Sequence, residues 1–241
     1  MIGLGTIINS AAILSGGVLG LFSGRLIRQE QQDALMKVCG ISVIFIAIAG
    51  AMQGMLRLDG DRLVGVRSML VVLCLALGTI AGELAGIEKG FERFGEWLKR
   101  KTGNSGDKTF VNAFVTASLT VCIGAMAIVG AIQDGLSGDF STLAVKSVLD
   151  FIIIAVMTSS LGKGCIFSAI PVFVFEGAVT LLARLISPVM TETATAYLSL
   201  IGSILIFCVG VNLVWEKKLR VANMLPAVLL AVGAAYIPWE F

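Results

Sequence analysis

The chain has 241 residues, of which 57% are hydrophobic and 14% are charged, and its mean hydropathy is +0.95. A soluble domain carries roughly 45–50% apolar and about 25% charged residues, so this composition indicates a protein of the lipid bilayer. The net charge is +2 and the sequence contains no histidine, which excludes Ser-His-Asp and Cys-His catalytic sets and histidine metal sites. We therefore expect no enzyme activity, no metal and no cofactor.

Eight apolar runs are candidates for transmembrane helices, because a hydrocarbon core roughly 30 Å thick needs about 20 helical residues. The runs are continuously apolar and lack the alternation of membrane β-strands. We therefore expect an all-α transmembrane bundle that forms a single integral membrane domain over residues 1–241. In chain order the runs cover residues 3–23, 36–56, 67–87, 110–133, 145–160, 165–186, 196–215 and 222–239.

The first run predicts the orientation of the bundle. It begins close to Met1, and its basic residues Arg25 and Arg28 follow the apolar stretch, which is the reverse of the order in a cleavable signal peptide. We expect this segment to be kept as a helix whose N-terminus lies outside the cytoplasm. With eight spans, both termini are then non-cytoplasmic in a bacterial plasma (inner) membrane.

Basic residues favour cytoplasmic loops, and their distribution agrees with this orientation. Thirteen of the 18 Lys and Arg residues fall on the expected cytoplasmic side: Arg25, Arg28, Lys37, Lys89, Arg93, Lys99, Arg100, Lys101, Lys108, Lys163, Lys217, Lys218 and Arg220. The other side receives Arg57, Arg62, Arg67, Lys146 and Arg184. This imbalance favours eight spans.

The longest expected loop, residues 88–109, lies on the cytoplasmic side. Phe91, Phe94, Trp97 and Leu98 recur at helical spacing among charged residues, which predicts an amphipathic helix on the inner leaflet. Its basic end suits anionic lipid headgroups. One short basic loop is the normal positive-inside signature, so we expect no nucleic-acid partner.

Two pairs of segments suggest an internal repeat of a two-helix unit. Residues 19–26 resemble residues 77–84, and residues 47–54 resemble residues 127–135. Each pair has the same expected direction through the membrane. Such repeats are typical of pseudo-symmetric bundles with a central pathway.

Glycines at a spacing of four residues mark one face of two of the runs. Gly16, Gly20 and Gly24 line one face of the first run, and Gly78, Gly82 and Gly86 line one face of the third. Such stripes allow close approach of helix backbones, so we interpret them as helix-packing residues. A sliding interface, or one between copies of the chain, is the functional alternative.

Two carboxylates, Asp150 and Glu176, interrupt the apolar runs. Asp150 precedes the expected turn at Gly162 by 12 residues and Glu176 follows it by 14, so both lie roughly 18–21 Å from the turn along their helices. At equal depth they could share a site for a proton or a hard cation such as sodium. The alternative is that Lys146, four residues before Asp150, pairs with it and leaves an interfacial charge.

Uncharged polar residues also occur within the spans. Asn9 lies in the first run, and Asn112 and Ser118 lie in the fourth. Together with Asp150 and Glu176 they are our candidates for binding an ion or solute along a wet path. Hydrogen bonding between helices is the alternative role.

Several segments resemble one bacterial membrane-protein family. They are Phe110–Leu119, Cys122–Gly130, Asp134–Leu136, Lys146–Asp150, Asn223–Ala227 and Gly3–Asn9. Together they resemble the family catalogued as domain of unknown function 554 (DUF554) over essentially the whole chain. The resemblance implies a bacterial inner-membrane protein from a family sometimes labelled as transport proteins.

We consider two functions. The first is a transporter or channel for a small solute or ion, favoured by the polar residues within the spans. The second is a non-transporting membrane assembly or sensor component that is packed through glycine-rich helices. The expected partners are the lipid bilayer, a small ion or solute, and further copies of the chain.

Overall fold

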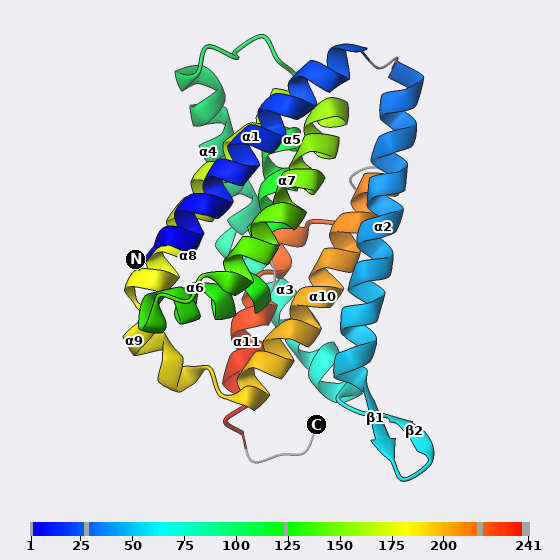
Figure 1. Cartoon of the computed structure of the whole chain (residues 1–241). Helices are drawn as coiled ribbons and strands as arrows, with labels where there is room; N and C mark the ends of the chain where they lie inside the picture. The colour runs from blue at the N-terminus through cyan, green and yellow to red at the C-terminus, as the bar shows by residue number, and fades with distance from the viewer. Residues whose placement is uncertain (1, 27–28, 123–124, 216–218, 238–241) are drawn as a thin grey trace.

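The structure is a computed structural model that describes residues 2–26, 29–122, 125–215 and 219–237 (Figure 1). In these ranges the α-helices are α1 (Leu4–Leu26), α2 (Gln29–Met55), α3 (Ser68–Ala85), α4 (Ile87–Lys101), α5 (Phe110–Cys122), α6 (Ala125–Ser137), α7 (Ser141–Leu161), α8 (Ala169–Leu181), α9 (Ala183–Ile186), α10 (Glu192–Val214) and α11 (Pro226–Ala234). Short 3-10 helices cover η1 (Lys163–Ser168), η2 (Ser187–Val189) and η3 (Val221–Met224). An antiparallel hairpin of β1 (Leu56–Asp59) and β2 (Arg62–Gly65) connects α2 to α3.

The expected all-α membrane-type bundle is confirmed. Among the described residues, five helical segments are long and apolar enough to cross a bilayer: Leu4–Gly24, Ser68–Ala85, Ser141–Leu161, Lys163–Leu181 and Glu192–Val214. The second and eighth expected spans correspond to shorter apolar helices, Gly40–Met55 and Val221–Ala234. The fifth, expected to be short, is a full-length helix of 21 residues.

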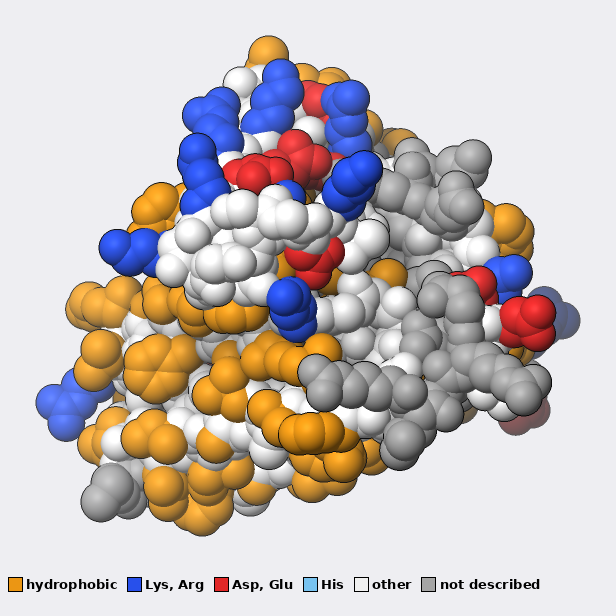
Figure 2. All heavy atoms as spheres, turned by 90° about the horizontal axis from the view of Figure 1, so that it is seen from above, with side chains coloured by type: hydrophobic (Ala, Val, Ile, Leu, Met, Phe, Trp, Pro, Cys, Tyr) orange, Lys and Arg blue, Asp and Glu red, His pale blue; other side chains and the backbone are white. Residues whose placement is uncertain are grey.

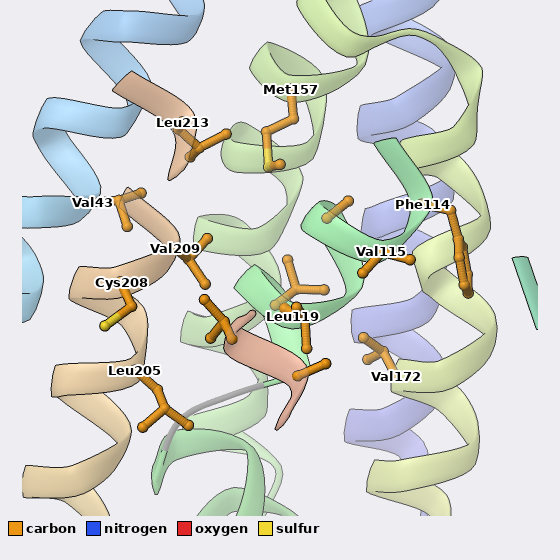
Figure 3. Close-up of a cluster of buried hydrophobic side chains, with 14 of the residues drawn as sticks. Val43, Phe114, Val115, Leu119, Met157, Val172, Leu205, Cys208, Val209 and Leu213 are labelled. Carbon is orange, nitrogen blue, oxygen red and sulfur yellow. The ribbon is translucent and has the colours of Figure 1, made fainter. Parts of the chain in front are cut away.

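The fourth expected span, residues 110–133, is not one continuous helix. It consists of α5 and α6, whose axes differ in direction by 61°. α5 is largely buried, because most of its apolar residues face neighbouring helices, while Asn112 and Thr116 lie on its less buried side. Figure 3 shows Phe114, Val115 and Leu119 of α5 among side chains from α2, α7, α8 and α10. A break in a helix is tolerated at membrane depth where protein surrounds it.

Glycines line the most extensive helix contact, between α1 and α7. A Cβ at Gly16, Gly20 or Gly24 would collide with the backbone of α7, successively at Phe151, Ala155 and Ser159. The contacts advance along both helices in the same direction, so α1 and α7 are parallel. Small residues at one face allow this approach, which confirms these three glycines as packing residues.

The glycines of α3 differ from one another in role. Gly78 and Gly82 pack against the backbone at Ala227 and Asn223, so α3 runs antiparallel to η3 and α11. Gly86 is not a packing residue: a Cβ there would meet nothing within 4 Å. It has a left-handed φ of 62° and ends α3 through a hydrogen bond from its N–H to the Glu83 carbonyl.

The two pairs of resembling segments do not pack equivalently. α1 lies parallel to α7, whereas α3 lies antiparallel to α11. α2 is one helix of 27 residues that packs antiparallel to α10, whereas α6 is the second part of a bent pair and packs against α8. The two copies of the suggested repeat therefore do not pack against equivalent helices.

The connections separate into two groups at opposite ends of the bundle (Figure 1). The α4–α5 connection lies at one end, and the β-hairpin and α9 lie at the other. Lys and Arg side chains gather on the first of these faces, seen from above in Figure 2. The expected amphipathic helix is confirmed as α4, whose Phe94 ring packs 5.8 Å from that of Phe114 in α5. Arg28, Lys217 and Lys218 of the expected cytoplasmic set lie outside the described residues.

Candidate functional site

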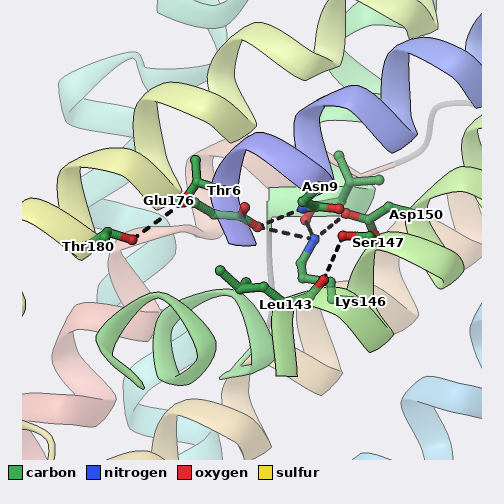
Figure 4. Close-up of polar contacts among 9 residues, drawn as sticks. Thr6, Asn9, Leu143, Lys146, Ser147, Asp150, Glu176 and Thr180 are labelled. Carbon is green, nitrogen blue, oxygen red and sulfur yellow. Dashed lines mark hydrogen bonds and ion pairs between the residues drawn. The ribbon is translucent and has the colours of Figure 1, made fainter. Parts of the chain in front are cut away.

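A buried cluster of three charged side chains lies where α7 and α8 meet the end of α5 (Figure 4). The Lys146 ammonium donates a hydrogen bond to Asp150 Oδ2, one helical turn further along α7. It donates a second, of 2.9 Å, to the Val121 carbonyl at the end of α5. Its Nζ also lies 3.5 Å from Glu176 Oε1 on α8. Lys146, Asp150 and Glu176 are 6%, 4% and 1% exposed, so these charges are removed from solvent.

Asn9 of α1 completes the cluster. Its Nδ2 donates a 2.9 Å hydrogen bond to Glu176 Oε1, and Asn9 itself is fully buried. Among the residues that the structure describes, Asn9 Oδ1 and Glu176 Oε2 have no protein hydrogen-bond partner. Two buried oxygen acceptors of the cluster are therefore open to a further ligand.

The neighbouring elements determine where these side chains lie. The glycine contacts hold α1 against α7, which brings Asn9 beside the α7 residues. Gly135 of α6 packs against the Thr180 backbone, which holds α8 at the same end of the bundle. The Lys146 ammonium donates to the Val121 carbonyl in the last turn of α5, where the negative end of the helix dipole favours a positive charge. The end of α5 is thus part of the site.

Polar contacts continue from the cluster toward the start of α1. Thr6 Oγ1 and Thr180 Oγ1 lie 3.4 Å apart, one turn from Asn9 and Glu176 respectively. Beyond them, the buried Asp134 carboxylate accepts hydrogen bonds from the Gly3 and Gly5 amides at 3.1 and 2.9 Å. A carboxylate at a helix N-terminus is favoured by the helix dipole. Polar contacts therefore follow α1 from its start to the cluster, first with α6 and then with α8.

A cavity of about 390 Å³ lies on the other side of the cluster, along α5. Asn112 and Thr116 of α5 line it together with Glu88 and Asn212, and Val115 and Leu119 add apolar surface. Asn112 and Thr116 lie between the α4–α5 connection and the end of α5 that Lys146 contacts. This cavity therefore extends along the helix that ends at the cluster.

The candidate residues fall into three groups in the structure. Asp150, Glu176 and Asn9 come together around Lys146, whereas Asn112 lies in the cavity. Ser118 is fully buried on α5, and within the described ranges its hydroxyl has no hydrogen-bond partner. Asp150 and Glu176 thus contact the same ammonium group, which bridges them.

The assignment of Lys146 to the external surface, in the count of basic residues, is wrong. Its side chain is buried inside the bundle, because two carboxylates and a helix-terminal carbonyl there compensate its charge. It does pair with Asp150, but the pair is not interfacial. The four-residue spacing was the sequence signal for this contact, whereas nothing in the spacing indicated Val121 or Glu176 as partners.

The cluster offers oxygen ligands and one ammonium group. With both carboxylates ionised and Lys146 protonated, its formal charge is −1. The described residues contain no group of three or more His, Cys, Asp or Glu side chains that could hold a metal ion. The carboxylate and amide oxygens of the cluster are hard ligands.

Large apolar side chains cover the outward faces of the helices. On α3 they include Met69, Val72, Leu77, Ile80 and Leu84, with Leu84 at 84% exposed. Exposed apolar surface around a bundle that buries its charges is the reverse of a soluble protein. The fold and the buried cluster define a polytopic helical membrane protein.

The chain belongs to the family described as "Protein of unknown function (DUF554)", whose profile matches residues 4–236. It is 27% identical to the uncharacterized membrane protein YdfK of Bacillus subtilis (strain 168) over 237 residues, which cover 98% of this chain and 97% of YdfK. It is 28% identical to the uncharacterized protein YqgA of Escherichia coli (strain K12) over 242 residues, 98% of each chain. No solved structure matches the chain.

Proposed function

We propose that the protein transports a small ion or solute across the bacterial inner membrane, by way of the Lys146–Asp150–Glu176 cluster. The observation that carries this proposal is the burial of three charged side chains inside an apolar bundle, with exposures of 6% or less. Each charge at the centre of a membrane helix costs roughly 2.5–3.5 kcal/mol on insertion scales. Charges retained at such a cost are typical of substrate and ion pathways.

The break between α5 and α6 supports the same function. Discontinuous helices in transporters present unpaired backbone groups to ions and substrates near the membrane centre. Here the end of α5 faces the cluster, and its Val121 carbonyl is already used as an acceptor by Lys146. The site therefore combines helix-terminal and side-chain ligands.

Polar groups on both sides of the cluster support access of an ion or solute to the cluster from either end of the bundle. The Thr6–Thr180 contact and Asp134 lie toward one end, and the cavity lined by Asn112 and Thr116 lies toward the other. Movement of α1 or α8 relative to α5 would connect the cluster to one end at a time. Asn9, Asn112 and Ser118 then line the path, as we expect from their positions in the spans.

Reconstituted protein tests this proposal. We expect proteoliposomes to show flux of at least one member of a panel of alkali cations, halides and small polar solutes, measured with potential-sensitive and ion-selective dyes. Asp150→Asn and Glu176→Gln should each reduce that flux at least tenfold, because each changes the charge of the cluster. Glu96→Gln is the matched control, since Glu96 is half-exposed on α4 and remote from the cluster.

An absence of flux for every member of the panel, with protein shown to be folded and inserted, would contradict transport. That result would favour the alternative of a non-transporting assembly or sensor component. Equal flux in the wild type and in both cluster variants would show transport by another route.

A further inference from the structure

We propose that the cluster binds one monovalent alkali cation, with Glu176 Oε2 and Asn9 Oδ1 as ligands. The inference rests on the proposed transport function and gives it a substrate or coupling-ion class. It follows from the unpaired atoms of the cluster, from the donors already in use, and from the sum of its charges.

The unpaired atoms of Asn9 and Glu176 are oxygen acceptors. In the part of the chain that the structure describes, neither Asn9 Oδ1 nor Glu176 Oε2 has a hydrogen-bond partner, and the two residues are 0% and 1% exposed. Buried acceptors without partners cost free energy, and a cation satisfies them directly. The Asn9–Glu176 hydrogen bond holds the two residues side by side, and Figure 4 shows both side chains directed toward Lys146 and Asp150.

The donors of the cluster are already in use. The Lys146 ammonium has three N–H groups, and it has three acceptors: the Val121 carbonyl, Asp150 Oδ2 and Glu176 Oε1. The Asn9 amide nitrogen has two N–H groups, and its partners are Glu176 Oε1 and the Asp150 carboxylate. An anion would therefore meet two carboxylates and no available ammonium donor, so the cluster does not suit an anionic ligand.

The charges set the valence of the ligand. With both carboxylates ionised, they and the ammonium sum to −1, and this ionised form is expensive in an apolar interior unless its net charge is balanced. A monovalent cation brings the cluster to neutrality, whereas a divalent cation would leave a net charge of +1 in the same apolar surroundings. Carboxylate and amide oxygens are hard ligands, which suit alkali cations.

Thermal unfolding of the purified full-length protein tests this site without requiring flux. Melting temperatures would be measured in LiCl, NaCl and KCl, with choline chloride as the reference at constant ionic strength. A cation that binds only the folded state should raise Tm by roughly 5–10 °C at about 100 times its Kd. We expect one of the three to do so more than the others, and sodium gluconate or potassium gluconate to reproduce the effect of the corresponding chloride.

Variants locate the effect at the cluster. Glu176→Gln neutralises the excess charge, so we expect it to abolish the cation-specific rise in Tm, and Asn9→Ala should weaken it at least tenfold in apparent Kd. Glu96→Gln should keep the wild-type response. If Glu176→Gln does not fold, the wild-type salt series together with Asn9→Ala decides the question.

Two results would overturn the inference: equal melting temperatures in all four chlorides, or a cation response that survives Glu176→Gln. Flux of a solute without any cation-specific stabilisation would reject this site and leave transport standing. Cation-specific stabilisation without any flux would reject transport and leave the binding site standing.

Discussion

Lys146 is the residue on which the charge cluster depends. It contacts both carboxylates and the last turn of α5, and it is buried with them. A buried ion pair contributes little net stability relative to an apolar core, but removal of one partner leaves an uncompensated charge. In this cluster the two possible removals are unequal. Loss of the lysine leaves two carboxylates with a net charge of −2, whereas loss of one carboxylate leaves an ion pair with a net charge of zero.

This asymmetry predicts the stability of two variants. Lys146→Met should destabilise the protein by roughly 3–5 kcal/mol, because it strands Asp150 and Glu176 in an apolar interior. Glu176→Gln should unfold near or above the wild-type temperature, because it keeps the side-chain volume and removes the excess charge. Thermal unfolding in detergent measures both.

Lys89→Met is the control for the first of these variants, since Lys89 is exposed on α4 and its loss should change stability by less than about 0.5 kcal/mol. Greater destabilisation by Glu176→Gln than by Lys146→Met would contradict an excess negative charge in the cluster.

At the scale of single residues, the sequence predicted how deep a residue lies in the membrane better than which neighbouring helix it faces. The rise of a helix placed Asp150 and Glu176 at similar depth, and both do contact one ammonium group. The side of its helix that each residue faces depends on tertiary contacts, such as those between the α1 glycines and α7. For the same reason the count of basic residues assigned Lys146 to the external side, since such a count treats every charge as exposed.

At the scale of elements, contacts through glycine hold the helices of the site in register. Gly20 of α1 meets the Ala155 backbone and the Thr158 side chain of α7, with no space for a methyl group. Transmembrane helices associate through such close packing because lipid removes the hydrophobic driving force between them.

Gly20→Ala should therefore destabilise the protein by about 1–3 kcal/mol, the usual cost of overpacking, and should move Asn9 relative to α7. Gly233→Ala in α11 is the matched control, since a Cβ at Gly233 meets nothing within 4 Å. The control should be neutral or stabilise by up to about 1 kcal/mol, because alanine favours a helix over glycine. Similar melting temperatures for the two variants would argue against the close α1–α7 contact.

The break between α5 and α6 could not be predicted from hydropathy. Residues 110–133 form one long apolar run, so length alone predicted a continuous span. The contacts around the break come from residues distant in sequence: most of α5 is buried against other helices, and Lys146 donates to the Val121 carbonyl at its end. By contrast, α3 exposes most of its surface and ends within two residues of the expected span 67–87, because a long exposed apolar run is what hydropathy detects.

At the scale of the whole molecule, the alternation of spans predicted which connections lie together. The parallel α1–α7 pair and the antiparallel α2–α10 and α3–α11 pairs follow the directions expected of eight alternating segments. The sequence therefore predicted the fold class and the relative directions of the helices. It did not predict which helices pack together, because apolar outer faces resemble one another in composition.

Labelling of single cysteines tests the absolute orientation. Ser105 and Ser137 are exposed in connections at opposite ends, and cysteine is close to serine in size. In intact spheroplasts a membrane-impermeant maleimide should modify Ser137→Cys and should reach Ser105→Cys only after permeabilisation. Ser137 is preferable to its neighbour Gly138, whose φ of 72° would strain a cysteine. The reverse labelling pattern would place the N-terminus in the cytoplasm.

Flux driven by an alkali-cation gradient tests the central claim most directly, since that claim joins transport to the buried cluster. Wild-type protein and Glu176→Gln would be reconstituted at equal density, and each would receive an inward gradient of the cation that most raises the wild-type melting temperature. We expect cation entry through the wild type, at least tenfold less through Glu176→Gln, and wild-type entry through Glu96→Gln. Equal cation entry through the wild type and Glu176→Gln would contradict it.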